Sequence, residues 1–286
     1  MRCEMKFETV ISPLDLDLTL ACGQTFRWRR LEGSWLGVLG SEVIRLRQEG
    51  RTLTIEAEPG RDDIVALVEE HLRARDDIRA VQRKLSSDRV LSSGMRDLKG
   101  LRIVKLDEWE SVVSFALATY ANIPRITKMI ETLCSKYGER LPGGFRAFPS
   151  QRQLRKASIN DLADCGLGYR AKYLHQLCRY LGPGEIARMK SLPYDELREQ
   201  LIELPGVGEK VADCVSLFGF GRLEAFPIDV WIERAMGRLY GEKGNYRKLR
   251  SFASDRFGAY AGYAQEYLYY NERTISGRGS CMFSEQ

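Results

Sequence analysis

Two side chains in the C-terminal half of the chain, Lys210 and Asp229, are of types that can break a bond to carbon. A lysine amine attacks carbon once it has lost its proton, and a nearby carboxylate stabilises positive charge that develops during the reaction. An unperturbed lysine has a pKa of about 10.4, so only roughly one in a few thousand is a free amine at neutral pH. We expect a helix N-terminus and partial burial to lower the pKa of Lys210.

A glycine-rich turn, Leu204-Pro205-Gly206-Val207-Gly208, lies directly before Lys210. Apolar residues recur at helical spacing on both sides of the turn, which predicts a helix-hairpin-helix at about residues 194–219. The second helix would begin near Gly208, where unpaired N–H groups and the positive end of the helix dipole can hold a phosphate. Gly206 and Gly208 have no Cβ, so a nucleic-acid backbone can approach them regardless of base sequence.

The spacing alone leaves other interpretations open. Lys210 precedes Asp213 by three residues, so the two can form an ion pair on a helix surface. Asp229 follows Pro227 and precedes an apolar segment, so a second alternative is that its sole role is to cap a helix. A helix-hairpin-helix without any catalytic function is the third alternative.

The chain changes character along its length. Residues 25–31, 35–39, 43–47 and 53–55 alternate like strands between glycine-containing turns, which predicts an antiparallel meander. From about residue 62 the apolar residues recur with helical periodicity. We therefore predict an α+β fold, with a small antiparallel β-rich N-terminal domain over residues 1–95 and a mostly α-helical domain over residues 96–286. A chain of 286 residues is long enough for two such cores.

Charge is distributed unevenly over the chain. The formal net charge is only +5, but residues 145–190 hold nine lysines or arginines against three acids, whereas residues 51–80 are net acidic. A basic stretch close to the hairpin fits a polyanionic partner, although such a stretch is often only a solvated surface.

Cysteine and histidine usage argues against metal or disulfide chemistry. The seven cysteines include no Cys-x-x-Cys pair, and there are only two histidines. We expect reduced thiols, no metal and no cofactor. The N-terminus has no signal-peptide apolar core, and the longest apolar stretch, at residues 112–123, is too short and too polar to span a bilayer. We expect no membrane partner and a cytoplasmic protein, associated with the nucleoid in a prokaryote or located in the nucleus in a eukaryote.

Short motifs spread over the chain resemble one known family. Residues 204–230 resemble the helix-hairpin-helix DNA glycosylase superfamily, and five motifs, one of them within this segment, are similar to those of the 8-oxoguanine DNA glycosylase family. These motifs are Cys22-Gly23-Gln24-Thr25-Phe26-Arg27-Trp28, Asn122-Ile123-Pro124-Arg125-Ile126-Thr127, Gly168-Tyr169-Arg170-Ala171-Lys172-Tyr173, Val211-Ala212-Asp213-Cys214 and Ala261-Gly262-Tyr263-Ala264-Gln265. They occur in order between about residues 10 and 273.

The resemblance implies a bifunctional DNA glycosylase and abasic-site lyase that acts as a monomer on duplex DNA containing oxidised guanine. It implies that Lys210 attacks the sugar C1′, expels the base and leaves an imine that permits β-elimination, while Asp229 stabilises charge on the sugar. The alternatives are a monofunctional glycosylase for alkylated bases, which needs no lysine, and a non-catalytic DNA-binding module.

Four residues are implied to recognise the base. Oxidised guanine carries a hydrogen on N7, so a backbone carbonyl can distinguish it from guanine, and Gly23 matches the residue that supplies this carbonyl. Gln265 would contact the Watson–Crick edge, Tyr269 would stack on the ring, and Cys214 would form the opposite wall of the pocket. The family usually has phenylalanine where this chain has Tyr269.

A further set of residues is implied to bind DNA. Arg125 and Arg170 match residues that hold the cytosine left behind when the lesion is extruded, and Tyr169 matches the wedge beside it. Two positions depart from the family pattern, because an asparagine that fills the gap aligns with Tyr120 and a histidine after the catalytic acid aligns with Trp231. The DNA-binding residues expected from the motifs are Asn122, Arg125, Tyr169, Arg170, Gly206, Gly208 and Trp231.

Overall fold

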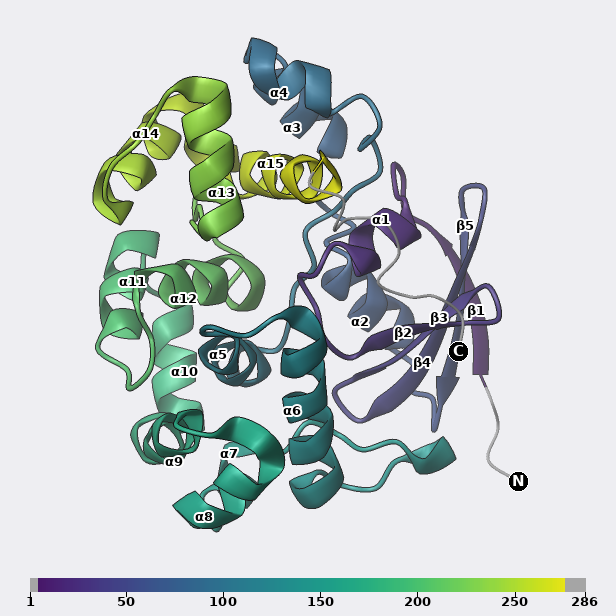
Figure 1. Ribbon diagram of the computed structural model, residues 1–286. Coiled ribbons are helices and arrows are strands. Elements are labelled where there is room, and N and C mark those ends of the chain that lie inside the picture. The colour runs from purple at the N-terminus through teal and green to yellow at the C-terminus, as the bar shows by residue number, and fades with distance from the viewer. Residues whose placement is uncertain (1–4, 276–286) are drawn as a thin grey trace.

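A five-stranded antiparallel sheet forms one side of the molecule in the computed structural model, which describes residues 5–275 (Figure 1). The strand order is β1-β5-β4-β3-β2. Their bounds are β1 Met5–Val10, β2 Trp28–Leu31, β3 Ser34–Leu39, β4 Glu42–Glu49 and β5 Thr52–Glu58. Strands β2 to β5 form the meander that the alternating pattern predicts, so the α+β class is confirmed.

Two details of the sheet differ from the sequence-based expectation. Strand β1 was not predicted, although Met5, Phe7 and Thr9 alternate with exposed residues along the sheet edge, where β1 pairs with β5. Lys6 and Glu8 on its exposed side are charged, so the segment does not stand out as a strand in the sequence. The first predicted strand begins three residues late, at Trp28, because the preceding segment is held by side chains rather than by a β-ladder.

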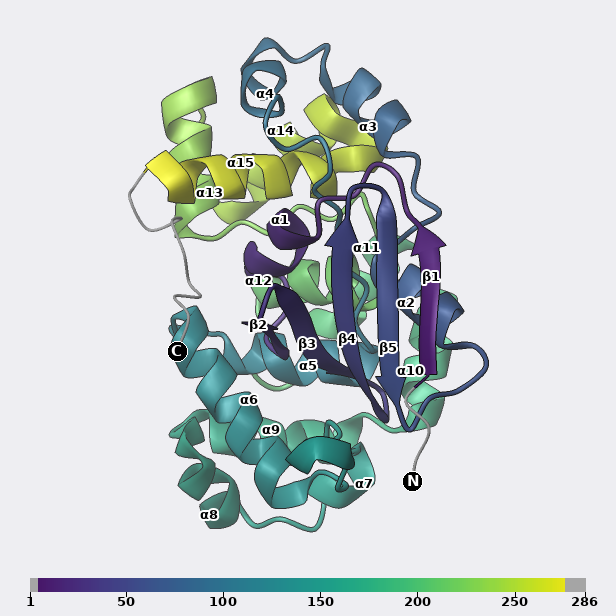
Figure 2. The ribbon, with the colours of Figure 1, turned by 90° about the vertical axis from the view of Figure 1, so that its right-hand side faces the viewer.

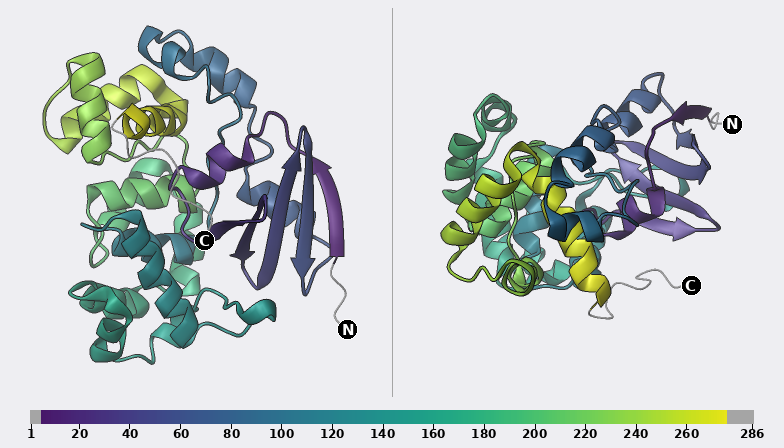
Figure 3. Two further views of the ribbon diagram at one scale, coloured as in Figure 1. Left: turned by 45° about the vertical axis from the view of Figure 1, so that its right-hand side comes forward. Right: turned by 90° about the horizontal axis from the view of Figure 1, so that it is seen from above.

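Helices make up most of the remaining described chain, and the sheet packs at their side (Figure 2). Figure 3 shows the same arrangement from two further directions. The helices are α1 Leu16–Ala21, α2 Ile64–His71, α3 Ile78–Leu85, α4 Arg89–Gly94, α5 Glu108–Leu117, α6 Ile123–Tyr137, α7 Gln151–Leu154, α8 Ile159–Leu162, α9 Arg170–Tyr180, α10 Pro183–Lys190, α11 Tyr194–Ile202, α12 Glu209–Cys214, α13 Val230–Ala235, α14 Tyr246–Phe257 and α15 Ala261–Ile275. Within residues 5–275, no helix is long and apolar enough to cross a membrane.

Helices α3 and α4 lie beside the C-terminal helices and away from the sheet (Figure 1). The side chain of Asn271 on α15 donates to the Gly94 carbonyl over 3.2 Å, and Asp88 at the start of α4 is bound by Tyr240 and Arg256. The N-terminal part of the chain therefore packs both in the sheet and against the C-terminal helices. The predicted domain boundary at residue 95 stays a prediction.

The hairpin consists of α11, a tight turn and α12, which continues into a π-helical segment at Val215–Gly219. Gly206 has a φ of +80°, and a Cβ there would lie 2.7 Å from the Cγ of Tyr173 on α9. Only glycine fits this turn, for reasons of both backbone conformation and space. Gly208 is the N-cap of α12, so the N–H groups of the first turn point out of the hairpin.

Asp213 fixes the inner face of α12. Its side chain is fully buried and accepts hydrogen bonds from Tyr194 over 2.6 Å, from Arg198 over 2.9 Å and from Tyr246 over 2.5 Å. These partners come from α11 and α14, so one carboxylate joins three helices. A buried charge held by this many donors positions the helix that carries Lys210.

We predict that Asp213→Ala lowers the free energy of unfolding by about 3–5 kcal/mol, because it leaves the Arg198 guanidinium and two hydroxyls without their shared acceptor. Urea unfolding followed by circular dichroism measures the change. Asp255→Ala, at an exposed position on α14, is the control and should change the value by less than about 0.5 kcal/mol. A loss below about 1 kcal/mol for Asp213→Ala would show that the network does not anchor the helix.

Candidate active site

Lys210 is the second residue of α12, directly beyond the hairpin. Its Nζ lies 5.7 Å from the centre of the Phe115 ring on α5, and Cys214 lies one helical turn further along. Asp213 faces the other way, toward Tyr194 and Arg198, so the surface ion pair between Lys210 and Asp213 that the spacing allowed does not form. The amine is directed into a partly buried site.

The electrostatic environment of Lys210 differs from our expectation. Burial alone lowers the pKa of this amine, but interactions with Cys214 and Asp229 outweigh it, and the pKa is raised above the ordinary value. Burial raises the pKa of the Cys214 thiol to about 11, so the thiol is neutral near pH 7 and Asp229 is the anion that matters there. The predicted lowering is therefore wrong for the protein without DNA, and Lys210 is an ammonium ion in this state.

Asp229 caps helix α13. Its Oδ1 accepts hydrogen bonds from the backbone N–H groups of Trp231 and Ile232, both over 3.0 Å. Capping uses one carboxylate oxygen and fixes the side chain, while Oδ2 takes no part in it. Asp229 is therefore both a structural cap and a fixed negative charge that acts on Lys210.

The predicted base-recognition residues come together from opposite ends of the chain. Gly23 has a φ of +99°, and a Cβ built on it would lie 2.7 Å from Ile123 Cδ1 and 3.8 Å from the Tyr269 hydroxyl. Tyr269 shares one face of α15 with Gln265. Gln265 is only 5% exposed, and its Oε1 has no hydrogen-bond partner among the described residues. A buried acceptor without a donor fits a site whose ligand is absent.

Two residues that the sequence analysis did not select lie behind this pocket. Glu266 is 3% exposed, and burial raises its pKa to about 7. Arg273 donates from Nη1 to the Cys22 carbonyl over 2.9 Å, and its guanidinium lies 5.1 Å from the Tyr269 ring centre. The signal available in the sequence is a glutamate in the middle of the apolar start of α15, where a charge is unusual.

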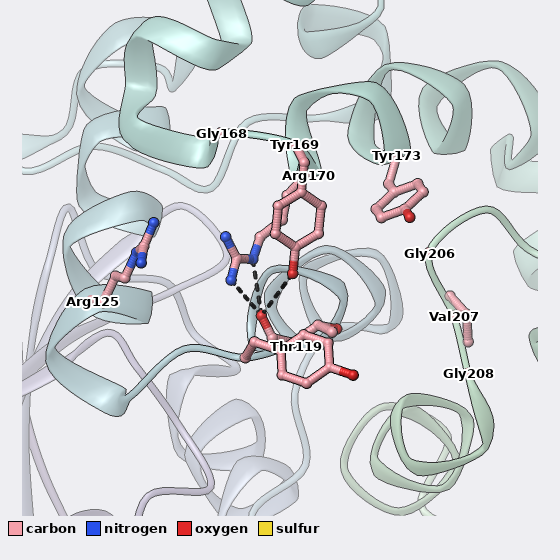
Figure 4. A pocket seen from close by; sticks show the side chains of 10 residues that line it. Thr119, Arg125, Gly168, Tyr169, Arg170, Tyr173, Gly206, Val207 and Gly208 are labelled. Atoms are coloured by element: carbon pink, nitrogen blue, oxygen red, sulfur yellow. Dashed lines mark hydrogen bonds between the residues drawn. The ribbon is translucent and has the colours of Figure 1, made fainter.

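A cavity of about 680 Å³ lies next to the hairpin and gathers most of the predicted DNA-binding residues (Figure 4). Arg125, Tyr169, Arg170, Gly206 and Gly208 line it, from three separate segments of the chain. Thr119, Tyr120, Gly168, Tyr173 and Val207 complete the lining. The space extends from the hairpin to the loop between α5 and α6.

Two of these side chains make defined contacts in the protein without DNA. Arg170 is 2% exposed, donates from Nε to the Thr119 carbonyl over 3.1 Å and lies 4.5 Å from the Tyr169 ring centre. The Tyr169 hydroxyl donates to the same carbonyl over 3.3 Å (Figure 4). These bonds hold the loop that carries Tyr120, which has a φ of +52° and is 93% exposed.

Asn122 and Trp231 lie at helix starts. The Oδ1 of Asn122 accepts from the Arg125 backbone N–H over 3.0 Å and so caps α6, beside the cavity and outside its lining. Trp231 lies in the first turn of α13 next to Asp229, and the Arg234 guanidinium is 5.1 Å from its ring centre. The roles of both residues in DNA binding stay predictions.

The fold, the hairpin and the lysine–aspartate pair define the class of the protein. Residues 113–257 match the family model of the HhH-GPD superfamily base excision DNA repair proteins. Residues 6–112 match that of the 8-oxoguanine DNA glycosylase N-terminal domain. The chain belongs to the 8-oxoguanine DNA glycosylase family of this superfamily.

Similar proteins cover nearly the whole chain. A probable N-glycosylase/DNA lyase of Methanothermobacter thermautotrophicus is 32% identical, with 92% of this chain and 95% of the relative aligned. N-glycosylase/DNA lyase OGG1 of Arabidopsis thaliana is 30% identical over 91% of this chain and 77% of the relative. The solved 8-oxoguanine glycosylase/lyase of Clostridium acetobutylicum, bound to duplex DNA with cytosine opposite 8-oxoguanine, superposes with a TM-score of 0.88 at 30% identity, covering 96% of this chain and all of that one.

We predict that Glu266→Gln removes a pH-dependent loss of stability. Because the folded-state pKa of Glu266, about 7, is above its unfolded value of 4.5, its contribution to stability is complete below pH 4.5 and is lost as the pH rises to 7. The stability of Glu266→Gln relative to the parent should rise by about 3 kcal/mol across this window, measured by urea unfolding at several pH values. A constant difference between the two proteins from pH 4.5 to 8 would contradict the assignment.

Proposed function

We propose that this chain excises 8-oxoguanine from duplex DNA and then cleaves the strand at the abasic site, with Lys210 as the nucleophile. The observation that carries this proposal is the partly buried Lys210 amine at the hairpin, within the field of the fixed Asp229 carboxylate. The names of the similar N-glycosylase/DNA lyases and of the solved glycosylase/lyase support both activities.

The reaction requires the Lys210 ammonium to lose its proton before attack. The neutral Nζ then bonds to C1′ while the glycosidic bond breaks. The electron pair of the broken bond leaves with the base, which takes up a proton. Asp229 stabilises the positive charge on the sugar while the bond breaks. The bound nitrogen then loses a proton, the C1′–O4′ bond breaks with O4′ taking up a proton, and the opened sugar is an imine. Loss of a proton from C2′ of this imine then breaks the C3′–O bond and releases the 3′ phosphate. Closure of DNA over the site excludes water, which acts with burial to disfavour the ammonium.

The base pocket supplies directional recognition. The Gly23 carbonyl would accept the N7–H that oxidised guanine has and guanine lacks, and the unpartnered Gln265 Oε1 would accept a donor from the Watson–Crick edge. Tyr269 and Cys214 would form the two walls. All of these residues belong to one chain, which supports a monomer as the active form.

The two alternatives are less well supported by the position of Lys210. A monofunctional glycosylase does not need an amine in the site, and a purely DNA-binding lysine is expected at the surface, where phosphates are reached. The Lys210 side chain instead points toward Phe115, Cys214 and Asp229.

We predict that borohydride traps a covalent complex between the protein and a duplex containing 8-oxoguanine. Lys210→Gln should abolish trapping because the imine cannot form, whereas Lys190→Gln, on the exposed end of α10, should trap at the parent rate. The measurement is a shifted band on a denaturing gel. Absence of trapping by the parent, or persistence in Lys210→Gln, would contradict the role of the amine.

We also propose that Tyr120 fills the gap left by the extruded base through stacking, where the family pattern has an asparagine. Base–aromatic stacking contributes about 1–3 kcal/mol per base, so Tyr120→Ala should weaken binding to lesion duplex by roughly 5- to 150-fold with any of the four bases opposite. Tyr120→Phe should bind like the parent. Fluorescence anisotropy in a Lys210→Gln background measures the affinities, and equal affinity of Tyr120→Ala and the parent would contradict stacking.

A further inference from the structure

The segment around Gly23 is held by side chains from several elements. The Gln24 side chain donates to the carbonyls of Thr19 and Arg102 over 3.0 and 2.7 Å and accepts from the Val104 N–H over 2.8 Å. On the other side of Gly23, Arg273 donates to the Cys22 carbonyl. The peptide group before Gly23 and the side chain of the residue after it are therefore both restrained.

Glu266 adds a contact to this segment from α15. Its carboxyl group lies beside the buried Cys22 thiol and interacts with it, while the thiol donates to the Thr19 carbonyl over 3.3 Å. The second carboxyl oxygen, Oε2, is buried and has no hydrogen-bond partner among the described residues. A carboxyl group in such a place costs stability, so a role in function is a reasonable explanation for its presence.

We propose that Glu266 is a positioning residue that, through Cys22, holds the Gly23 carbonyl in the direction needed to distinguish 8-oxoguanine from guanine. This inference rests on the proposed role of Gly23. A carbonyl discriminates between a donor and a lone pair at N7 only if it points at that atom, because hydrogen bonds weaken steeply when misaligned. Gly23 itself has no side chain to anchor it and adopts a φ that other residues rarely adopt, so its direction must be set by its neighbours.

Glu266 lies next to the proposed base pocket on α15. Gln265, the preceding residue, faces the proposed base pocket, and Tyr269 lies 3.8 Å from the position of a Gly23 Cβ. The charged groups acting on Glu266 are Arg273 and Asp229, of which Arg273 also binds the Cys22 carbonyl. Lys210 acts on the other side of the site, where it interacts with Cys214.

The test compares recognition of the base with cleavage of a sugar that has no base. In the Lys210→Gln background, the ratio of affinities for 8-oxoguanine duplex and undamaged duplex reports recognition. Glu266→Ala should lower this ratio about fivefold to tenfold, the loss expected from one misaligned hydrogen bond. Glu266→Gln, which keeps a polar group beside the thiol, should have the ratio of the parent. With Lys210 present, cleavage of a preformed abasic site by Glu266→Ala should fall by less than the recognition ratio, because Asp229 stays fixed as the cap of α13.

A second route makes the inference independent of how one variant folds. Cys22→Ala should lower the recognition ratio as Glu266→Ala does, and the double variant should lose nothing more, because both changes remove the same contact. Glu266→Leu, which fills the volume without a polar atom, should match Glu266→Ala.

An unchanged recognition ratio in Glu266→Ala and Glu266→Leu would overturn the inference, as would an equal fall in abasic-site cleavage. Gly23→Ala separates this failure from that of the proposed function. If Gly23→Ala lowers the ratio and the Glu266 variants do not, the Gly23 carbonyl recognises the base without help from Glu266. If Gly23→Ala also leaves the ratio unchanged, the role of the carbonyl itself is wrong.

Discussion

The attraction between Lys210 and Asp229 is the constraint on which the site depends. The carboxylate that we propose to stabilise positive charge on the sugar also stabilises the ammonium form of the proposed nucleophile, which cannot react. DNA phosphates add further negative charge, so they favour the ammonium as well. Exclusion of water is the remaining influence that favours the neutral amine. The reactive state would therefore require a complex closed to water. By the same reasoning, Lys210 would be unreactive in the protein without DNA.

Helix α12 meets this constraint by having two faces with different tasks. One face carries Lys210 and Cys214 toward the site, and the other carries Asp213 into a network with Tyr194, Arg198 and Tyr246. Asp229 is fixed separately, by capping α13. Nucleophile and carboxylate are thus placed by rigid helix starts, so binding DNA does not have to order them.

The sequence predicts what depends on local periodicity and misses what depends on distance in space. The hairpin, the turns of the meander and the capping ability of Asp229 follow from residues close together in the chain. The direction of the Lys210 pKa shift could not be inferred, because it depends on how near the fold brings Asp229. The position of Glu266 within an apolar segment indicates burial, but its partner could not be inferred, because Cys22 lies far away in the sequence and only the fold brings the two together. The meeting of Gly23 with Tyr269 followed only from resemblance to a family, since no local pattern joins residues so far apart.

Recognition on the two sides of the extruded base would rest on different physics. On the lesion side the groups are buried and restrained. Gly23 lies between the bound Cys22 carbonyl and the anchored Gln24 side chain, and Gln265 has a buried acceptor without a partner among the described residues. Directional hydrogen bonds need such rigidity, because a small rotation removes their selectivity. On the opposite side Tyr120 is almost fully exposed, on a loop that Arg170 and Tyr169 hold through one carbonyl. An aromatic ring can stack on every base, so it needs only to lie at the right place. A chain that relies on stacking there loses selectivity for the base opposite the lesion and keeps selectivity for the lesion itself.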